Sequence, residues 1–355
     1  MAPGSITALA PCRVDLAGGT VDIWPLYLFH PGAVTVNFAV NVLTRCTIHA
    51  VPGKKIRLKS LDTGAEDHFD NCDALCSAKR LRHALAAYLV RFFCPEGGFE
   101  LETHSESPAG AGISGSSALM IATAAALARW SGRRLDLEDI RVLAQNVEAQ
   151  LIRVPTGCQD YYPALYGGVN AISLAPDGIH REAIPVPAEE IDARFLLAYT
   201  GAPRQSGINN WEVFKAHING DRRVFRNFEE IVAVARAMHH ALATANWQEV
   251  ARLLREEWKL RRTNAPRIST PLIEKLVAVA AKNGGLAAKV CGAGGGGCVI
   301  FQVDPEAKQR VVNAIRGSGG RVLEFKVARE GLTFAAPGRH AKTARARGPI
   351  TGRQA

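Results

Sequence analysis

The sequence predicts an α+β protein of two lobes, and three observations lead to this fold class. Residues 5–60 are rich in short strand-like segments. Strand-like and helix-like segments then alternate along most of the remaining chain. A proline-containing loop precedes the strand that begins the second half, so we place the joint between the lobes near 178–190. With 355 residues, the chain can bury the cores of one large domain or two.

The first half begins with strands and continues with helices. Apolar and alternating runs predict strands at 6–19, 33–40, 44–53 and 55–60, a helix at 79–95 and a strand at 98–107. The apolar stretch that Gly132 ends predicts a buried helix. Asp136 and Asp139 resemble a helix cap, which opens a helix that Pro155 stops, and a strand follows at 167–175.

The second half follows a loop at 176–190. It is expected to contain a strand at 194–201, helices at about 208–218, 223–243, 247–261 and 271–285, a strand at 298–303 and a closing segment at 324–334.

The net charge of +10 would suit a nucleic-acid-binding protein, but its location argues against one. Residues 337–355 hold five Lys or Arg and no acid, with the composition of a disordered extension. The body shows no basic stripe interleaved with aromatic residues. We therefore expect no nucleic-acid partner, and a moderately basic body suits a small anionic substrate equally well.

The cysteines and apolar segments indicate an ordinary cytoplasmic protein. The eight cysteines include no CxxC pair, and although Cys72 and Cys76 lie four apart, no second pair completes a zinc site. No apolar run approaches the roughly 20 residues that span a bilayer. The N-terminus lacks the basic region of a signal peptide. We expect a cytoplasmic monomer or homodimer with reduced thiols and no membrane partner.

Two glycine-rich segments draw attention. Glycine loop 1, residues 108–117 (PAGAGISGSS), runs straight into the apolar helix. Free N–H groups feeding a helix N-terminus can hold an anion, usually phosphate, although a tight turn before a core helix is the alternative. Glycine loop 2, residues 291–297, contains G-x-G-x-x-G but leads into a strand, which excludes the dinucleotide-binding motif.

An acidic pair lies between these loops. Glu148 is expected at the edge of the apolar face of its helix, half-buried and in need of a partner such as a cation. Asp160 follows beyond the Pro155–Gly157 turn. A single carboxylate at a helix edge is more often solvated or salt-bridged than functional. The pair gains interest from its place downstream of a candidate phosphate loop.

The order of four segments resembles the GHMP kinases, the superfamily of galactokinase, homoserine kinase, mevalonate kinase and phosphomevalonate kinase. The segments are APCRVDLAGGTVD, PAGAGISGSSAL, EAQLIRVPTGCQD and KVCGAGGGG. The resemblance implies an N-terminal lobe with a left-handed βαβ crossover and a ferredoxin-like C-terminal lobe, with ATP and acceptor in the cleft between them. We expect domains at 4–180 and 190–335, followed by a basic disordered tail at 337–355.

The resemblance also implies roles for individual residues. ATP phosphates would lie against Pro108, Gly110, Ala111, Gly112, Ile113, Ser114, Gly115, Ser116 and Ser117. Ser116 and Glu148 would ligate Mg²⁺, Asp160 would meet the acceptor hydroxyl, and Arg13 would stabilise developing charge. Substrate-binding residues are expected at Gly19, Thr20, Asp22, Gly294 and Gly295.

Departures from the galactokinase pattern narrow the acceptor. Galactokinases carry Gly-Glu-His-Thr-Asp where this chain has GGTVD at 18–22, which argues against galactose. LAGGTVDIWP and YTGAPRQSG resemble the branch of bacterial D-glycero-D-manno-heptose 7-phosphate kinases and fucokinase-like enzymes. The expected reaction is ATP-dependent phosphorylation of the anomeric hydroxyl of a heptose 7-phosphate-like sugar, with Arg204 and Ser206 holding its phosphate. The alternatives are a kinase for mevalonate or another GHMP acceptor, and a non-catalytic GHMP-fold regulator that binds a ligand.

Overall fold

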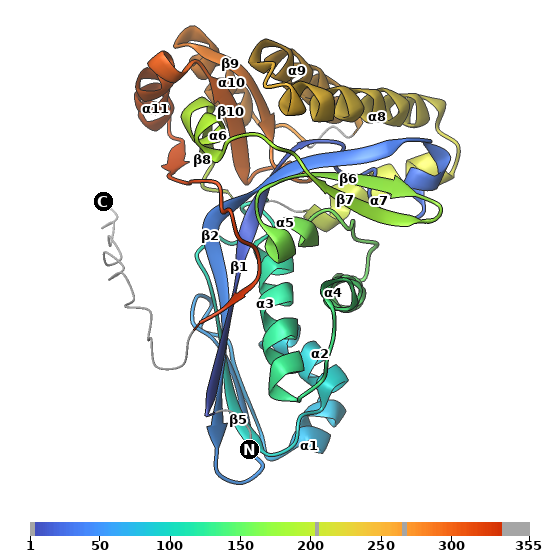
Figure 1. Cartoon of the computed structure of the whole chain (residues 1–355), viewed down its shortest axis with the longest axis vertical. Coiled ribbons are helices and arrows are strands. Elements are labelled where there is room, and N and C mark those ends of the chain that lie inside the picture. The colour runs from blue at the N-terminus through green and yellow to red at the C-terminus, as the bar shows by residue number, and fades with distance from the viewer. Residues whose placement is uncertain (1–3, 203–205, 265–267, 336–355) are drawn as a thin grey trace.

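The computed structural model describes residues 4–202, 206–264 and 268–335, and the basic tail expected at 337–355 lies outside them. Within these residues the chain forms two sheets (Figure 1). The first sheet has the strand order β12-β1-β2-β5-β3-β4, with β6 and β7 attached beside β2. The second has the order β11-β8-β10-β9. Separate sheets with helices packed on each agree with the expected two-lobed α+β fold.

Two long strands form the backbone of the first lobe. β1 (Ser5–Ala17) and β2 (Ala33–Val51) pair antiparallel along nearly their whole length. The separate strands expected at 33–40 and 44–53 are therefore one strand. Its first part pairs with β6 (Val169–Ala175) and its last part with β5 (Gly98–Ser105), so a single strand holds together two regions with different neighbours.

The remaining strands of this lobe include a parallel pair. β3 (Ile56–Ser60) runs parallel to β5, and the connection between them passes through β4 (Glu66–Phe69), α1 (Cys72–Ser77) and α2 (Ala84–Phe93). A parallel pair needs such a crossover because its strands point the same way. The helix expected at 79–95 is shorter and is preceded by α1.

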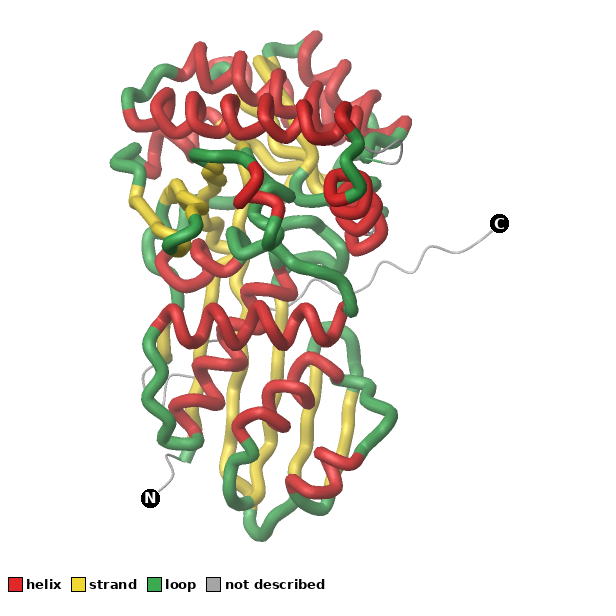
Figure 2. The backbone as a smooth tube through the Cα atoms, turned by 90° about the vertical axis from the view of Figure 1, so that its right-hand side faces the viewer, coloured by secondary structure: helices red, strands yellow, loops and turns green. Residues whose placement is uncertain are grey.

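Helices cover one face of the first sheet (Figure 2). The helix α3 (Gly115–Trp130) packs on β1 and β2 and is buried almost all round, as its apolar sequence predicts. The helix α4 (Leu137–Ile152) begins at Asp136, where Asp136 and Asp139 form the reciprocal bonds of a capping box. The short α5 (Tyr161–Tyr166) follows the turn after α4.

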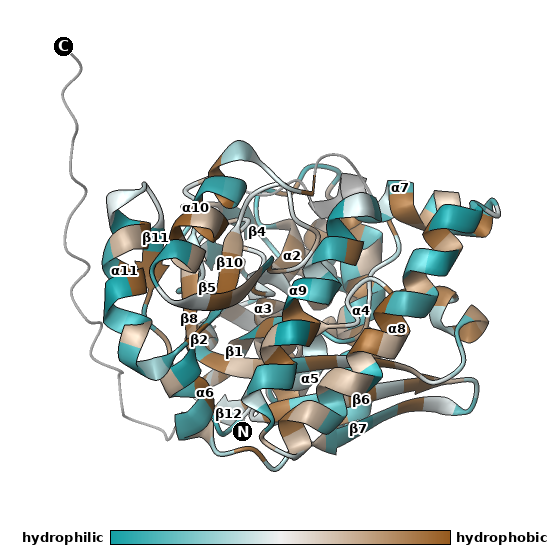
Figure 3. Ribbon diagram, turned by 90° about the horizontal axis from the view of Figure 1, so that it is seen from above, coloured by the Kyte–Doolittle hydropathy of each residue, from teal (hydrophilic) through white to brown (hydrophobic). Residues whose placement is uncertain are grey.

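The second sheet is antiparallel throughout. It contains β8 (Phe195–Tyr199), β9 (Gly285–Val290), β10 (Cys298–Val303) and β11 (Arg321–Leu323). The last strand pairs with the first, which is the order of a ferredoxin-like sheet. The helices of this half are α7 (Ser206–Ile218), α8 (Arg222–Ala243), α9 (Trp247–Asn264), α10 (Pro271–Lys282) and α11 (Lys308–Gly317). Hydrophobic and hydrophilic residues alternate along α8 (Figure 3), because one of its sides is buried.

The joint between the lobes contains regular structure where a loop was expected. Residues 178–183 form β7, which pairs with β6, and α6 (Ala188–Arg194) leads into β8. The expectation missed both because the segment carries polar residues and prolines between its few apolar positions. The chain finally returns to the first lobe, where β12 (Thr333–Phe334) pairs with β1. Two single 3-10 turns, at Leu26–Phe29 and Pro305–Ala307, complete the description. No helix of the described residues is long and apolar enough to cross a membrane.

Candidate active site

Two cavities meet at the N-terminal end of α3. The first has a volume of about 130 Å³ and is lined by residues of both lobes, including Arg13, Asp22, Asp160 and Arg261. The second has a volume of about 330 Å³ and is lined mainly by glycine loop 1. Ser116 lines both cavities. The two cavities therefore adjoin at Ser116.

Glycine loop 1 has a backbone that few side chains would permit. Gly110 and Gly112 have positive φ angles, and so does Ser114, which precedes the first residue of α3. A Cβ atom added at Gly115 would lie 2.9 Å from the Cβ of Ser107. The loop thus runs tightly around the start of α3, where unpaired N–H groups favour an anion. The cavity beside it favours the anion-binding interpretation over a simple tight turn.

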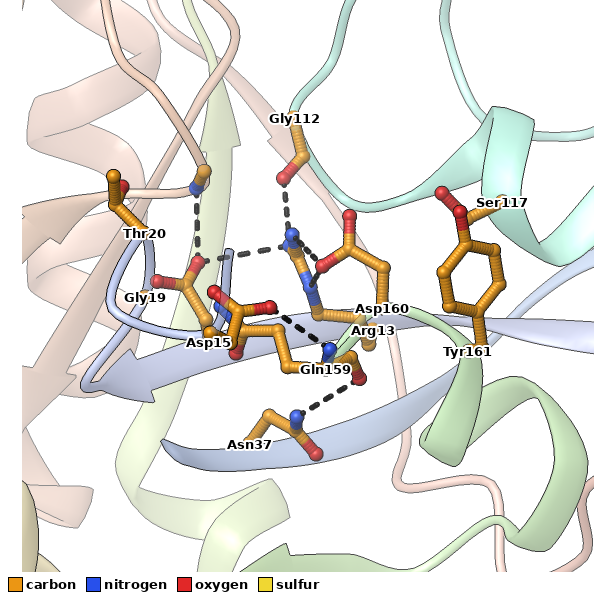
Figure 4. A network of polar contacts seen from close by, with 12 residues as sticks. Arg13, Asp15, Gly19, Thr20, Asn37, Gly112, Ser117, Gln159, Asp160 and Tyr161 are labelled. Atoms are coloured by element: carbon orange, nitrogen blue, oxygen red, sulfur yellow. Dashed lines mark hydrogen bonds and ion pairs between the residues drawn. The ribbon is translucent and has the colours of Figure 1, made fainter. Parts of the chain in front are cut away.

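Arg13 joins this loop to Asp160. Its Nε and Nη2 atoms donate to Asp160 Oδ1 over 2.9 and 2.6 Å, and its Nη1 donates to the carbonyl of Gly112 over 2.8 Å (Figure 4). Burial lowers the pKa of Arg13, but the charges of Asp160 and Asp15 outweigh burial and keep its pKa above the ordinary value. The Asp160 side chain is 22% exposed, while that of Arg13 is only 3% exposed. The buried cation therefore fixes a carboxylate that remains open to the cavity.

Glu148 lies in a different environment, and the expectation of a half-buried residue was wrong. Its side chain is buried, and its oxygens accept hydrogen bonds from Ser116 Oγ at 2.9 Å, Ser117 Oγ at 2.9 Å and Tyr161 Oη at 2.6 Å. Glu148 is buried because α3 and α5, which carry these three hydroxyl groups, pack against α4. Burial raises the pKa of Glu148, and the hydroxyl donors oppose that rise only in part.

The turn at residues 18–22 forms another wall of the first cavity. Asp22 is buried and accepts a hydrogen bond from the Gln159 backbone N–H over 2.9 Å. Burial, reinforced by the charge of Asp160, raises the pKa of Asp22 to about 6. Gly157 packs so closely that an added Cβ would lie 2.0 Å from Asp22 Oδ2. Gly19 and Thr20 line the same cavity.

A chain of four buried charges ties this turn to the second lobe. Asp15 Oδ2 accepts from Lys289 Nζ over 2.6 Å, and Lys289 Nζ lies 3.8 Å from Glu257 Oε1. Glu257 Oε1 in turn accepts two bonds from Arg261, whose Nη2 also donates to the Gly19 carbonyl over 2.8 Å. Burial raises the pKa of Asp15, but the neighbouring cations Lys289, Arg13 and Arg261 hold it below its ordinary value.

Glycine loop 2 supports the site through its backbone. Gly292 N–H donates to Asp15 Oδ1 over 2.9 Å, and Cys298 N–H donates to the Ala111 carbonyl over 2.7 Å. Gly292 and Ala293 line the first cavity. Gly294 and Gly295, the residues expected to bind substrate, lie beside Ile268: Gly295 N–H donates to its carbonyl over 2.8 Å, and a Cβ at Gly294 would lie 2.5 Å from the same oxygen.

The expected anion-binding pair is placed only in part. Arg204 lies outside the described residues, and Ser206 is the first residue of α7. Further along α7, Asn210 lines the first cavity and its Oδ1 accepts a bond of 3.4 Å from Thr20 Oγ1. The helix that follows Arg204 therefore reaches the cavity.

Sequence reasoning missed the buried charges around this site. Asp15 had a usable signal, because it stands two positions after Arg13 in a strand and so shares its face. Glu257 and Arg261 lie four apart on a helix rich in charge, a spacing that fits a solvated ion pair equally well. The sequence around Lys289 showed no pattern that indicates a buried charge, and that around Tyr161 showed none that indicates a contact with Glu148.

Two family models match the chain. The model of the GHMP kinases N terminal domain matches residues 75–168, and that of the GHMP kinases C terminal matches residues 238–320. The first match contains glycine loop 1 and the acidic pair. The second contains α9, α10, β9, glycine loop 2, β10 and α11.

Curated relatives are similar over different lengths. D-glycero-alpha-D-manno-heptose 7-phosphate kinase of Campylobacter jejuni is 28% identical over 338 residues, which is 92% of this chain and 98% of the relative. The mevalonate kinase of Thermococcus sibiricus is also 28% identical, but over 66% of this chain and 68% of the relative.

Solved structures share the fold. A D-glycero-D-manno-heptose 1-phosphate kinase from Bacteroides thetaiotaomicron matches with a TM-score of 0.73 and 24% identity, covering 93% of this chain and 99% of that one. The galactokinase of Lactococcus lactis in complex with galactose matches with a TM-score of 0.76 and 18% identity, covering 94% and 95%.

Proposed function

Because the chain belongs to the GHMP kinase superfamily, we propose that it transfers the γ-phosphate of ATP to a hydroxyl of a sugar or sugar phosphate. The acceptor proposed is the anomeric hydroxyl of a heptose 7-phosphate-like sugar. The C. jejuni heptose 7-phosphate kinase supports this choice, since its similarity extends over nearly the whole of both chains. The proposed domains are 4–180 and 190–335, with residues 333–334 returning to the first sheet.

One observation carries the proposal: Ser116 lines both cavities, and Asp160 faces the first of them. We assign ATP to the side of glycine loop 1 and the acceptor to the cavity of Asp160. The loop N–H groups and the start of α3 would then hold the phosphates. Transfer would occur near Ser116, where the two bound molecules meet.

The chemistry follows from how Asp160 is held. Both bonds from Arg13 converge on Oδ1, and Asp160 is ordered by a cation that is itself buried. We assign Asp160 as the group that accepts the proton of the acceptor hydroxyl. The hydroxyl oxygen forms a bond to the γ-phosphorus while the bond from that phosphorus to the β,γ-bridging oxygen breaks. Arg13, bonded also to the Gly112 carbonyl, keeps the base and the loop at a fixed separation.

The residues at Glu148 fit a magnesium ion. Mg²⁺ takes oxygen ligands at about 2.0–2.1 Å in an octahedron, so adjacent ligand oxygens stand roughly 2.9–3.0 Å apart. Ser116 Oγ and Glu148 Oε1 are 2.9 Å apart. Burial raises the pKa of Glu148, and a cation beside it would favour the charged form of this carboxylate. When bound with ATP, the ion would neutralise charge on the phosphates; Ser116 and Glu148 are the residues that would hold it.

The proposed acceptor carries an anionic group at the end remote from the reacting hydroxyl. We assign Arg204 and Ser206 to that group, supported by the position of Asn210, further along the same helix, at the first cavity. Gly19, Thr20 and Asp22 would face the sugar hydroxyls. A kinase for mevalonate is the second candidate. It is supported by the similarity to a mevalonate kinase, which extends over 66% of this chain. A non-catalytic regulator is the third, and the paired Arg13 and Asp160 argue against it.

The test is a screen of ATP consumption against heptose 7-phosphate, fucose, other hexoses and mevalonate. We expect the highest kcat/KM with heptose 7-phosphate and phosphorus NMR evidence for phosphate at the anomeric carbon. A higher kcat/KM with mevalonate would show that the acceptor is mevalonate and not a sugar phosphate. ATP binding without turnover of any acceptor would favour the regulator.

The anionic subsite has its own test. Arg204→Ala should raise the acceptor KM by about 10–100-fold, because a charge-assisted hydrogen bond contributes roughly 1.5–3 kcal/mol, while the KM for ATP stays unchanged. A neutral sugar as the best substrate, with its KM unaltered in the variant, would contradict the subsite and leave the kinase assignment intact.

A further inference from the structure

Three cysteines gather at the end of the first lobe that lies away from the candidate active site. Cys72 and Cys76 belong to α1, and Cys94 ends α2 (Figure 1). Cys72 Sγ lies 2.7 Å from Cys94 Sγ, and all three Sγ atoms lie within 4.8 Å of one another. Among the described residues, no other set of three His, Cys, Asp or Glu ligand atoms is grouped in this way.

The arrangement brings together residues that the sequence keeps apart. Cys72 and Cys76 are four apart on a helix and so share its face. Cys94 comes from a second helix, where it takes a left-handed conformation with φ of 42°. The sequence contained only one pair, and the missing partner is a single residue supplied by the fold.

The scaffold around the cluster is firmly held. Arg91, on α2, donates to the Leu75 carbonyl over 3.2 Å and to the Ala78 carbonyl over 2.5 Å, so it fastens the end of α1 to α2. Asn71 caps the start of α1 by accepting from Ala74 N–H over 2.9 Å. The three sulfurs therefore converge on prearranged helices, and only side-chain rotation is needed to adjust them.

These thiols differ from the others in the protein in their exposure. Cys76 and Cys94 are exposed and Cys72 is half-buried, whereas the remaining five cysteines are buried. Buried thiols serve as small hydrophobic side chains. Exposed and convergent thiols are open to solutes and can be reached by an ion.

We propose that Cys72, Cys76 and Cys94 form a binding site for a thiophilic divalent cation of the zinc class, with solvent as the fourth ligand. Thiolates bind such ions at about 2.3 Å, which places the sulfurs of a tetrahedral site roughly 3.8 Å apart. All three sulfurs lie within 4.8 Å of one another, and the Cys72 and Cys94 sulfurs, now 2.7 Å apart, would separate by about 1 Å to hold the ion. Three sulfurs meeting at one point favour an ion over a disulfide, which would use two of them and leave the third unpaired.

The site has a structural consequence. An ion there would link the start of α1 to the end of α2, and α2 packs on α3. Because the link lies away from both cavities, the ion would stabilise the first lobe without entering the phosphoryl-transfer chemistry. Each bound ion releases protons from the thiols, so binding weakens as pH falls.

The experiment uses the full chain, reduced with a phosphine and freed of metal by chelation. Cd²⁺ is titrated while thiolate-to-cadmium charge-transfer absorption is recorded, and Zn²⁺ affinity is measured by competition with a chromogenic chelator. We expect saturation at about one ion per chain and a rise in Tm on binding. Cys76→Ser should weaken binding by more than roughly 100-fold, since even changes behind the ligands cost about 10–100-fold.

Ser77→Ala is the matched control, because Ser77 is an exposed neighbour on the same helix and offers no thiol. It should bind Cd²⁺ as the parent does. Equal binding by Cys76→Ser and the parent would overturn the proposal. So would a reduced protein that shows no charge-transfer band, or a Cys72–Cys94 disulfide that forms in the presence of Zn²⁺ and excludes the ion.

Discussion

Two sides of the candidate active site hold a carboxylate by opposite means. Asp160 is fixed by the buried guanidinium of Arg13 and remains partly exposed. Glu148 is buried and held by three neutral hydroxyl groups. An ion pair holds the first carboxylate in place at the cavity, where a substrate can meet it. Burial raises the pKa of the second carboxylate, and its neutral hydroxyl donors oppose that rise only in part. The groups that hold each carboxylate therefore indicate its chemical role more clearly than its position in a sequence motif does.

Replacing the charge-paired carboxylate should have the largest effect. Asp160→Asn keeps the shape of the side chain but removes the proton acceptor, so kcat should fall by roughly 10²–10⁴-fold. The Kd for ATP, measured by calorimetry, should stay near the parent value. Asp177→Asn, at an exposed position with a side chain 79% exposed, is the control and should be fully active. A near-normal kcat in Asp160→Asn would show that Asp160 is not the proton acceptor, and the two carboxylates would then not differ in role as described.

Replacing the hydroxyl-held carboxylate should change the metal requirement instead. Glu148→Gln removes the charge that a cation would meet, so we expect the Mg²⁺ concentration for half-maximal rate to rise by about tenfold or more. Asp160→Asn should leave that Mg²⁺ concentration unaltered, which makes each variant the control of the other. Coincident Mg²⁺ curves for Glu148→Gln and the parent would assign Glu148 a structural role only.

The two serines should divide into a ligand and a support. Ser116 lines both cavities, whereas Ser117 lines only the first and is buried. Ser116→Ala should raise the Mg²⁺ requirement a few-fold with little change in Tm. Ser117→Ala should leave the Mg²⁺ curve in place and lower Tm, because a lost hydrogen bond costs about 0.5–1.5 kcal/mol. The reverse pattern would exchange their roles.

The pH dependence should show the smallest but most specific effect. A raised pKa means that Glu148, without a cation, contributes stability below its ordinary value of 4.5, and that this contribution is lost as pH rises through its higher folded value. Mg²⁺ would offset that loss, so the Tm gain from Mg²⁺ should increase with pH. Calorimetry from about pH 5 to pH 8 measures the gain. In Glu148→Gln it should not vary with pH, and a parent gain that is flat with pH would contradict the environment described for Glu148.

The sequence was sufficient for most of the long helices and strands and for the local signals of the site. Glycine density marked loop 1, and the capping pair Asp136 and Asp139 marked the start of α4. The environment of Glu148 could not be foreseen, because Tyr161 and the serines reach it only through packing of three helices. Helical periodicity placed its Cβ at an edge, but periodicity says nothing about which element covers that edge.

The same limit applies to contacts between lobes. Lys289 and Asp15 stand 274 residues apart in the sequence, and nothing in the segment around either residue indicates the other as its partner. The strand β7 was missed for a related reason: a strand with exposed residues on both faces has no apolar pattern to reveal it. Local propensity is weak there, and pairing with β6 decides the structure.

The charge chain that runs from Asp15 through Lys289 and Glu257 to Arg261 has a consequence for unfolding. Removing either lobe from the other would leave charges that are buried now without their partners, and breaking one buried pair costs about 3–5 kcal/mol. Neither lobe can then melt first without destabilising the second. The two sheets should behave as one cooperative unit and give a single calorimetric transition. Lys289→Met, which breaks the chain at its middle, is the variant in which that transition should separate into two.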